Sequence, residues 1–256
     1  MYRSGMNRLD SVNIRIGLAD VQIGQAVEAL GLRSIRPSRS TLHLLDYRPG
    51  SAASSLASAG VTISVADSGE QSLTTVQVRH VRRRHLYPRW AAFYGRDVEM
   101  LLIEEERDST RRVLAASLTA RYEHSGPALA GADLCLTDLL TPRQWSFMQD
   151  CAPGPPQPGL IHPVGPIPVL SWTISLDRID ATMSRWRLPG TAGGTGPALE
   201  LAEVSRRSLP AEAGFLLPAM AASMRRRGLD PDGDVPWLET RAAQWAADPR
   251  TRAKQP

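Results

Sequence analysis

The fold is decided most clearly by residues 61–81, which read VTISVADSGEQSLTTVQVRHV. In both halves of this stretch apolar and polar residues alternate, which is the period of a half-buried β-strand. A turn signal of aspartate, serine and glycine stands between the halves at 67–69. The pattern therefore predicts an antiparallel hairpin with strands over 61–66 and 73–81.

Further strands and helices are expected on both sides of this hairpin. The other strands should cover residues 12–18, 40–47, 97–103, 113–121, 168–174, 182–188 and 198–207, and the helices residues 21–30, 51–59, 141–151, 211–227 and 237–247. Thr141 is the expected N-cap of its helix. The acidic run Glu104–Glu106 should be a solvated strand end or hairpin tip, and residues 153–168, dense in proline and glycine, an extended connection.

The order of these elements indicates the fold class. Helices do not alternate regularly with strands, which favours an α+β fold built on a mostly antiparallel sheet or barrel with helices packed outside. The 256 residues are 42% hydrophobic, and we expect one domain over residues 1–256 with frayed tails at about 1–10 and 248–256. No apolar stretch is long enough for a membrane helix, and we find no signal peptide. Cys135 and Cys151 are read as reduced thiols, which indicates a cytoplasmic protein.

The charge of the chain is carried almost entirely by arginine. The net charge is +4, and Lys254 is the only lysine. This excess is small and lacks a basic stripe with stacking aromatics, so we expect a small-molecule partner and no nucleic acid or membrane. Self-association into a homo-oligomer stays open.

Several arginines stand in the middle of expected strands, opposite apolar neighbours. They are Arg15, Arg79, Arg121, Arg185, Arg187 and Arg207. Two interpretations remain open. The arginines can form the wet face of a half-exposed sheet. Alternatively they line the interior of a barrel, where the missing negative charge would come from a ligand, most simply a phosphate chain.

Several segments, in this order, resemble the CYTH superfamily of triphosphate tunnel enzymes, in an actinobacterial-type branch. They are AGVTISV, TTVQVRHV, DVEMLLIEE, RRVLAASLTARY, LELAEVSRRS and LETRAAQWA. The resemblance covers roughly residues 12–247. It implies an eight-stranded antiparallel tunnel whose walls carry basic residues for a triphosphate and glutamates for Mg²⁺ or Mn²⁺. Members hydrolyse triphosphates or cyclise ATP.

The first strand departs from the family's signature of two glutamates and a lysine. The matching positions hold Asn13, Arg15 and Gly17, and Gln77 stands where lysine is frequent. Glu99 and Glu203 fit the family's later acidic positions, which implies that they are the catalytic and metal-binding residues. The resemblance thus gives a substrate-binding set of Asn13, Arg15, Gln77, Arg79, Arg121, Arg185, Arg187 and Arg207.

The expected function is that of a divergent enzyme acting on a phosphorylated small molecule, triphosphate or nucleotide-like, in an arginine-lined tunnel. If the family's chemistry survives, it would be a phosphohydrolase or a cyclase-type lyase. One alternative is a repurposed barrel enzyme of specialised metabolism with a non-phosphate substrate. The other is a non-catalytic protein that binds nucleotide or polyphosphate.

Overall fold

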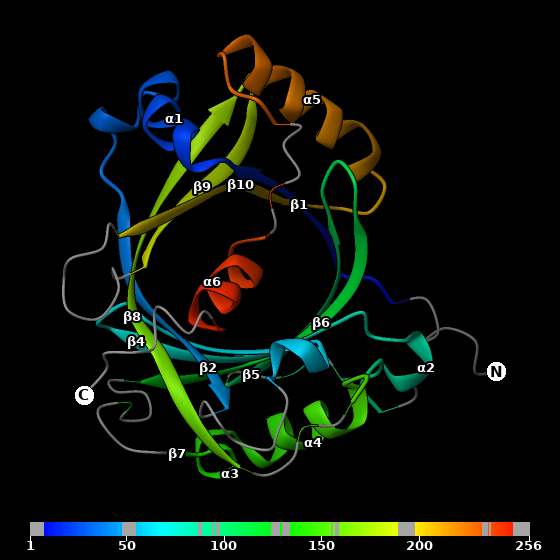
Figure 1. Ribbon diagram of the computed structural model, residues 1–256. Helices are drawn as coiled ribbons and strands as arrows, with labels where there is room; N and C mark the ends of the chain where they lie inside the picture. Colours follow the sequence, from blue (N-terminus) through cyan, green and yellow to red (C-terminus); the bar gives the residue numbers. More distant parts are fainter. Residues whose placement is uncertain are drawn as a thin grey trace. The chain divides into compact units, whose positions relative to one another are not determined.

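The structure, shown in Figure 1, is a computed structural model. It describes residues 8–47, 55–86, 89–93, 95, 98–123, 129, 134–154, 156, 159–188, 198–231, 235 and 237–247. Most of the tails expected at 1–10 and 248–256 lies outside the described residues, as do residues 51–54 of the expected short helix.

The described residues form ten strands and six α-helices. The strands are β1 (Ser11–Leu18), β2 (Ser38–Tyr47), β3 (Val61–Asp67), β4 (Gln71–Arg79), β5 (Glu99–Arg107), β6 (Arg112–Glu123), β7 (Leu134–Cys135), β8 (Leu160–Leu176), β9 (Ile179–Leu188) and β10 (Leu199–Ser208). The helices are α1 (Ile23–Ala29), α2 (Arg83–Leu86), α3 (Leu136–Leu139), α4 (Pro142–Cys151), α5 (Ala213–Arg226) and α6 (Leu238–Ala247).

The strands pair in the order β2-β3-β4-β6-β5-β1-β10-β9-β8-β7, and β2 pairs with β8 as well. Apart from the two-residue β7, the order therefore returns to its first strand, which is the pairing pattern of a β-barrel. The expectation of eight antiparallel strands is wrong, because nine strands take part in this cycle. Directions cannot alternate around an odd number of strands, so at least one neighbouring pair is parallel.

The chain divides into two compact units. Unit 1 holds β3, β4, β6, β7 and α2 to α4, and unit 2 holds β1, β9, β10, α1, α5 and α6. The long strands β2, β5 and β8 contribute residues to both units. Each unit is described by itself below.

Unit 1 packs α4 against the apolar face of β3, β4 and β6 (Figure 1). Ile63, Val76 and Leu118 are fully buried there, in one core with Phe147 and Met148 of α4. The intervening side chains point the other way, because side chains alternate along a strand. We call them the polar face of unit 1: Thr62, Ser64, Thr75, Gln77, Arg79, Ser117, Thr119 and Arg121.

Unit 2 carries helices on both sides of β1 and β10 (Figure 1). Ile14, Ile16 and Leu18 are buried on the side of α1 and α5, whereas α6 lies on the opposite side. Directly paired residues of neighbouring strands share a face. The registers of β1, β10 and β9 therefore identify the residues that lie on the side of α6. We call them the polar face of unit 2: Asn13, Arg15, Gly17, Ser184, Glu203, Ser205 and Arg207.

Two stretches differ from the sequence-based expectation. The acidic run lies inside β5 and not at a solvated end, and Glu104 and Glu106 are only 2% and 1% exposed. Buried carboxylates need partners for their charge, which a hydropathy pattern does not reveal. The expected connection over residues 153–168 is also largely strand, because β8 begins at Leu160. Proline is compatible with a strand wherever its position needs no N–H donor.

Other expectations are confirmed. Thr141 caps α4 in a capping box, in which Thr141 Oγ1 accepts from the Gln144 backbone N–H and Gln144 Oε1 accepts from the Thr141 N–H. Cys135 and Cys151 are free thiols, and burial raises the pKa of Cys151 to about 12, so that it stays protonated. Of the helices described, none has the length and apolar character that crossing a membrane requires.

Candidate functional site

Arg15 is the centre of the polar face of unit 2. It lies in the middle of β1 with 3% of its surface exposed, and its guanidinium contacts carboxylates from three elements. Its Nε donates to Glu203 Oε1 at 2.8 Å, its Nη1 to Glu106 Oε1 at 3.0 Å, and its Nη2 to Glu239 Oε2 at 2.7 Å. One side chain thus holds β10, β5 and α6 at the same point of β1.

The Arg15 guanidinium faces two buried carboxylates, Glu106 and Glu203, and the half-buried carboxylate of Glu239. Burial lowers the pKa of Arg15, but the three carboxylates outweigh it and hold that pKa well above its usual value. Burial also raises the pKa of Glu203; Arg15 opposes the rise, while Glu239 and Glu106 add to it. The cluster therefore holds a charged arginine beside a glutamate that retains its proton to higher pH than usual.

Glu203 has one carboxyl oxygen that this cluster does not use. Its Oε1 accepts from Arg15, whereas its Oε2 is buried without a hydrogen-bond partner among the described residues. A buried polar atom without a partner is costly and marks a place where a ligand or water would be stabilised. Perturbed carboxyl groups of this kind are frequent at functional sites.

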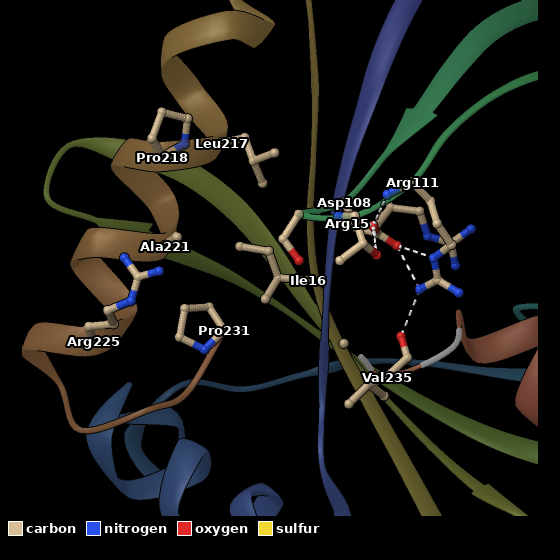
Figure 2. A pocket seen from close by; sticks show the side chains of 13 residues that line it. Arg15, Ile16, Asp108, Arg111, Leu217, Pro218, Ala221, Arg225, Pro231 and Val235 are labelled. Atoms are coloured by element: carbon tan, nitrogen blue, oxygen red, sulfur yellow. Dashed lines mark hydrogen bonds and ion pairs between the residues drawn. The ribbon is translucent and has the colours of Figure 1, made fainter. Parts of the chain in front are cut away.

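A second arginine stands beside the first. The indole ring of Trp237 lies under both guanidinium groups, with Arg15 Cζ 5.4 Å and Arg111 Cζ 5.0 Å from the ring centre. Arg111 donates to Asp108 Oδ2 at 2.7 Å through Nε and to the Val235 carbonyl at 3.0 Å through Nη2 (Figure 2). Burial favours protonated Asp108, but hydrogen bonds from Arg111 and Thr110 outweigh this and lower its pKa.

A cavity of about 210 Å³ adjoins these residues, between β1, the β5–β6 turn and α5 (Figure 2). Its apolar lining consists of Ile16, Leu217, Pro218, Ala221, Pro231 and Val235. Arg225 of α5 and Arg111 of the turn also line it. An apolar cavity with a few polar groups is the usual form of a small-molecule site.

The polar face of unit 1 has a different chemistry. Arg79 is 8% exposed and donates from Nη1 to Thr62 Oγ1 at 3.2 Å. Thr75 Oγ1 lies 2.9 Å from Thr119 Oγ1 across the β4–β6 pair. From Thr75 to Arg79 the directly paired residues on this face are serine, threonine or alanine, and none is acidic. Hydroxyl, amide and guanidinium donors on one half-buried face suit the oxygens of a phosphate group.

The predicted substrate-binding residues are spread over three faces. The polar face of unit 2 carries Asn13, Arg15 and Arg207, and that of unit 1 carries Gln77, Arg79 and Arg121. Arg185 and Arg187 point to the opposite face of unit 2, the side of α1 and α5, and Arg185 pairs with Glu200 there. The alternation that suggested a row of arginines therefore places two of the eight predicted residues on the other side of the sheet.

Glu99 and Glu203 do not lie in the same unit. Glu99 belongs to unit 1, where its Oε1 accepts from Thr141 Oγ1 at 2.6 Å and its Oε2 pairs with Arg143. Both partners belong to the start of α4, so Glu99 anchors that helix to β5. Its role in catalysis or metal binding stays a prediction.

The described residues do not fit the divalent metal that the family implies. None of their histidine, cysteine, aspartate and glutamate side chains gather in groups of three or more that could hold an ion. The carboxylates that do converge, Glu106, Glu203 and Glu239, converge on the Arg15 guanidinium. The positive charge that these carboxylates contact on β1 is therefore the Arg15 guanidinium and not a metal ion.

Sequence reasoning missed five residues of this cluster: Glu106, Asp108, Arg111, Trp237 and Glu239. The available signal was the requirement for counter-charges around an arginine buried between Ile14 and Ile16. That requirement predicts carboxylates near Arg15, but it does not predict which strand or helix supplies them.

Comparison with known proteins gives a limited result. A solved structure with a similar backbone is that of the candidate adenylyl cyclase HpAC1 from Hippeastrum, for which a dominant triphosphatase activity is described. The match covers 91% of this chain and 96% of that chain, with 12% identity and a TM-score of 0.45. No family model matches the chain, and no curated protein matches it. A likeness at this level carries no functional argument, so the function is argued from the two polar faces.

Proposed function

We propose that the chain is a diverged CYTH-type enzyme that acts on a phosphorylated small molecule, a triphosphate or a nucleotide-like compound. The observation that carries this proposal is the state of Glu203. Its carboxyl is buried on a polar strand face, its pKa is raised by burial, and its Oε2 has no partner among the described residues. A carboxyl group in this state can donate a proton to a leaving oxygen or accept one from water.

The binding groups of the proposal lie on the same face as Glu203. Arg207 pairs directly with Asn13, and Ser205 stands between Arg207 and Glu203 on the same side of β10. Residues two apart on a strand are separated by about 6.6 Å, so this row offers donors to successive oxygens of a phosphate chain. In hydrolysis, water would attack phosphorus, the phosphorus–oxygen bond would break, and Glu203 would give its proton to the leaving oxygen. The proton that the attacking water loses would then restore the carboxyl group of Glu203.

The polar face of unit 1, taken by itself, also carries donors that suit the oxygens of a phosphate group. Arg79 supplies positive charge there, and its neighbours Thr62 and Thr75 supply hydroxyl groups. Guanidinium groups bind phosphate through two parallel hydrogen bonds, which gives orientation as well as affinity. We assign phosphate binding to Asn13, Ser205 and Arg207 and proton transfer to Glu203, and each assignment is tested separately.

The test of the proposed function is a phosphate-release assay on ATP and on inorganic triphosphate. Glu203→Gln should lower the rate by about 10²- to 10⁴-fold, because the amide cannot transfer the proton. Glu200→Gln is the matched control, since Glu200 lies on the same strand but pairs with Arg185 on the opposite face. Equal rates in the wild type and Glu203→Gln, or no phosphate release by the wild type, would contradict the proposal.

A second candidate function is favoured by the cavity in Figure 2. Its lining of Ile16, Leu217, Ala221 and Val235 suits a ligand with a hydrocarbon body, as in the alternative of a repurposed enzyme with a non-phosphate substrate. A thermal-shift screen separates the two candidates, because a ligand that binds the folded chain raises its melting temperature. Stabilisation by inorganic triphosphate supports the first candidate, and stabilisation by apolar compounds alone supports the second. Triphosphate binding without phosphate release would identify the non-catalytic alternative.

A further inference from the structure

The inference concerns the cavity of about 210 Å³ in unit 2, between β1 and α5 (Figure 2). One side of α5 forms its outer wall, because residues three and four apart on a helix lie on the same side. This wall consists of Leu217, Pro218, Ala221 and Arg225. The side chain of Ile16 on β1 points towards it (Figure 2). Glu203 points to the side of α6, so a ligand in the cavity would not occupy the proposed catalytic face.

Two prolines limit how far the walls of the cavity can fill it. Pro218 lies inside α5, where its ring pushes against the preceding turn and it cannot donate a helical hydrogen bond. Pro231, buried on the segment after α5, is equally rigid. Ala221 contributes only a methyl group to the wall. An apolar space that its walls do not fill lowers stability, and a ligand of the right shape would restore the missing contacts.

The apolar lining indicates the kind of ligand body that fits. Its side chains are aliphatic: Ile16, Leu217, Pro218, Ala221, Pro231 and Val235. None of these lining residues offers an aromatic ring for stacking, so the lining suits a hydrocarbon chain better than a base or another flat ring. Since an apolar cavity of about 150 Å³ takes up benzene, this one has room for a chain of about seven carbons.

The charged residues of the lining indicate where an anionic end of the ligand would lie. Arg111 Nε donates to Asp108 Oδ2 at 2.7 Å, and the Thr110 backbone N–H donates to Asp108 Oδ1 at 2.9 Å. The Asp108 carboxylate is therefore satisfied within its own turn, and Arg15 is surrounded by the carboxylates of its cluster. Arg225 is exposed on α5, across the cavity from Arg15 (Figure 2). A guanidinium at the rim of an apolar cavity suits a ligand with a buried chain and an exposed carboxylate.

We propose that this cavity binds a medium-chain aliphatic carboxylate, with its chain between Ile16 and α5 and its carboxylate at Arg225. The inference goes beyond the proposed function, because the ligand would lie apart from Glu203 and would not be a phosphate compound. It also differs from the second candidate function, because the ligand is bound and not converted. Among the described lining residues Asp108 is the only carboxylate, and Arg111 and Thr110 hold it.

The test is a methyl NMR titration of the full chain with butanoate, hexanoate and octanoate. The methyl signals of Ile16, Leu217 and Val235 should shift together and reach saturation. Affinity should rise about four-fold with each added methylene, because each one buries further apolar surface. Hexan-1-ol, which has the chain of hexanoate without its charge, should bind about ten-fold more weakly than hexanoate. No shift with octanoate, an affinity independent of chain length, or equal affinities for hexanoate and hexan-1-ol would overturn the inference.

A first variant fills the cavity from α5. Ala221→Leu should lower the affinity for octanoate at least about ten-fold, because the larger side chain takes the space of the ligand. Ala222→Leu is the matched control, since it makes the same change at the next residue of the helix, which does not line the cavity. Equal affinities of the two variants for octanoate would overturn the inference.

A second variant removes the charge at the rim and replaces an exposed side chain, so it does not depend on repacking the cavity. Arg225→Gln should weaken hexanoate about ten-fold and leave hexan-1-ol unchanged. Arg226→Gln is the matched control, because Arg226 is also exposed on α5 but pairs with Asp177. The same affinity for hexanoate in both variants would overturn the placement of the carboxylate. Binding of octanoate by a chain that releases no phosphate would keep this inference and reject the proposed function.

Discussion

The two polar faces are built on the same strand alternation but place different side chains beside their buried arginine. On unit 1, Arg79 donates to Thr62, and the positions directly paired with Thr75, Gln77 and Arg79 hold serine, threonine or alanine. On unit 2, Arg15 is surrounded by Glu106, Glu203 and Glu239. The first face is rich in hydroxyl groups, whereas the second gathers carboxylates around Arg15 beneath α6 and leaves Arg207 exposed at its other end. An arginine in a strand therefore does not by itself indicate a phosphate site, because the side chains around it determine whether an anion can bind.

The largest effect that this comparison predicts follows from Arg15→Met. Removing the guanidinium leaves the buried carboxylates of Glu106 and Glu203 and the half-buried one of Glu239 without their common partner. Loss of one member of a buried ion-pair cluster costs about 3–5 kcal/mol. The free energy of unfolding, measured in urea, should fall by this amount. Arg185→Met breaks a half-exposed pair on the other face of the same unit and should cost less than about 1 kcal/mol. Equal losses in the two variants would show that the carboxylates do not depend on Arg15.

A smaller, pH-dependent effect is expected for Glu203→Gln. Burial raises the pKa of Glu203 above its ordinary 4.5, so the folded state holds this proton more tightly than the unfolded state. The stability that the carboxyl contributes is then present at low pH and is lost as the pH rises through its folded pKa. Glutamine does not titrate, so the wild type should lose stability relative to Glu203→Gln as the pH rises above 4.5 and through the raised folded pKa. Melting temperatures of both proteins across pH measure this; parallel curves would show that the pKa is not raised.

The smallest effect belongs to the polar face of unit 1. Thr75 and Thr119 form a cross-strand hydroxyl pair, and replacing either by valine should cost at most about 1 kcal/mol. A double-mutant cycle with Thr75→Val and Thr119→Val should give a coupling energy of about 0.5 kcal/mol. A coupling near zero would mean that the two hydroxyl groups act independently, and the face would be less ordered than its hydrogen bonds indicate.

Local patterns in the sequence predicted the local structure well. The alternation over residues 61–81 gave the β3–β4 hairpin, and Thr141 with Gln144 gave the capped start of α4. These features depend on residues near one another in the chain. The alternation also placed Asn13, Arg15 and Gly17 on one face of β1, and Glu203, Ser205 and Arg207 on one face of β10, because the strand period is two.

The errors came from contacts between distant segments. Glu104 and Glu106 look like solvated residues by composition, yet both are buried, and Glu106 binds Arg15 from 91 residues away. Periodicity shows that Arg185 differs in face from Trp186, but it does not show which of the two faces matches that of Arg15. Only strand register fixes this relation. The covering of Arg15 by α6, from 224 residues away along the chain, has no local signal at all.

The central claim is that the polar face of unit 2 binds a phosphorylated ligand, and two neighbouring arginines of β10 test it most directly. Arg207 lies on that face opposite Asn13, whereas Arg206 lies on the other face opposite Ile14. Calorimetric titration with inorganic triphosphate should show binding to the wild type and to Arg206→Gln, with an affinity about ten-fold weaker for Arg207→Gln. Equal affinities for the two variants, or no binding to the wild type, would contradict the claim.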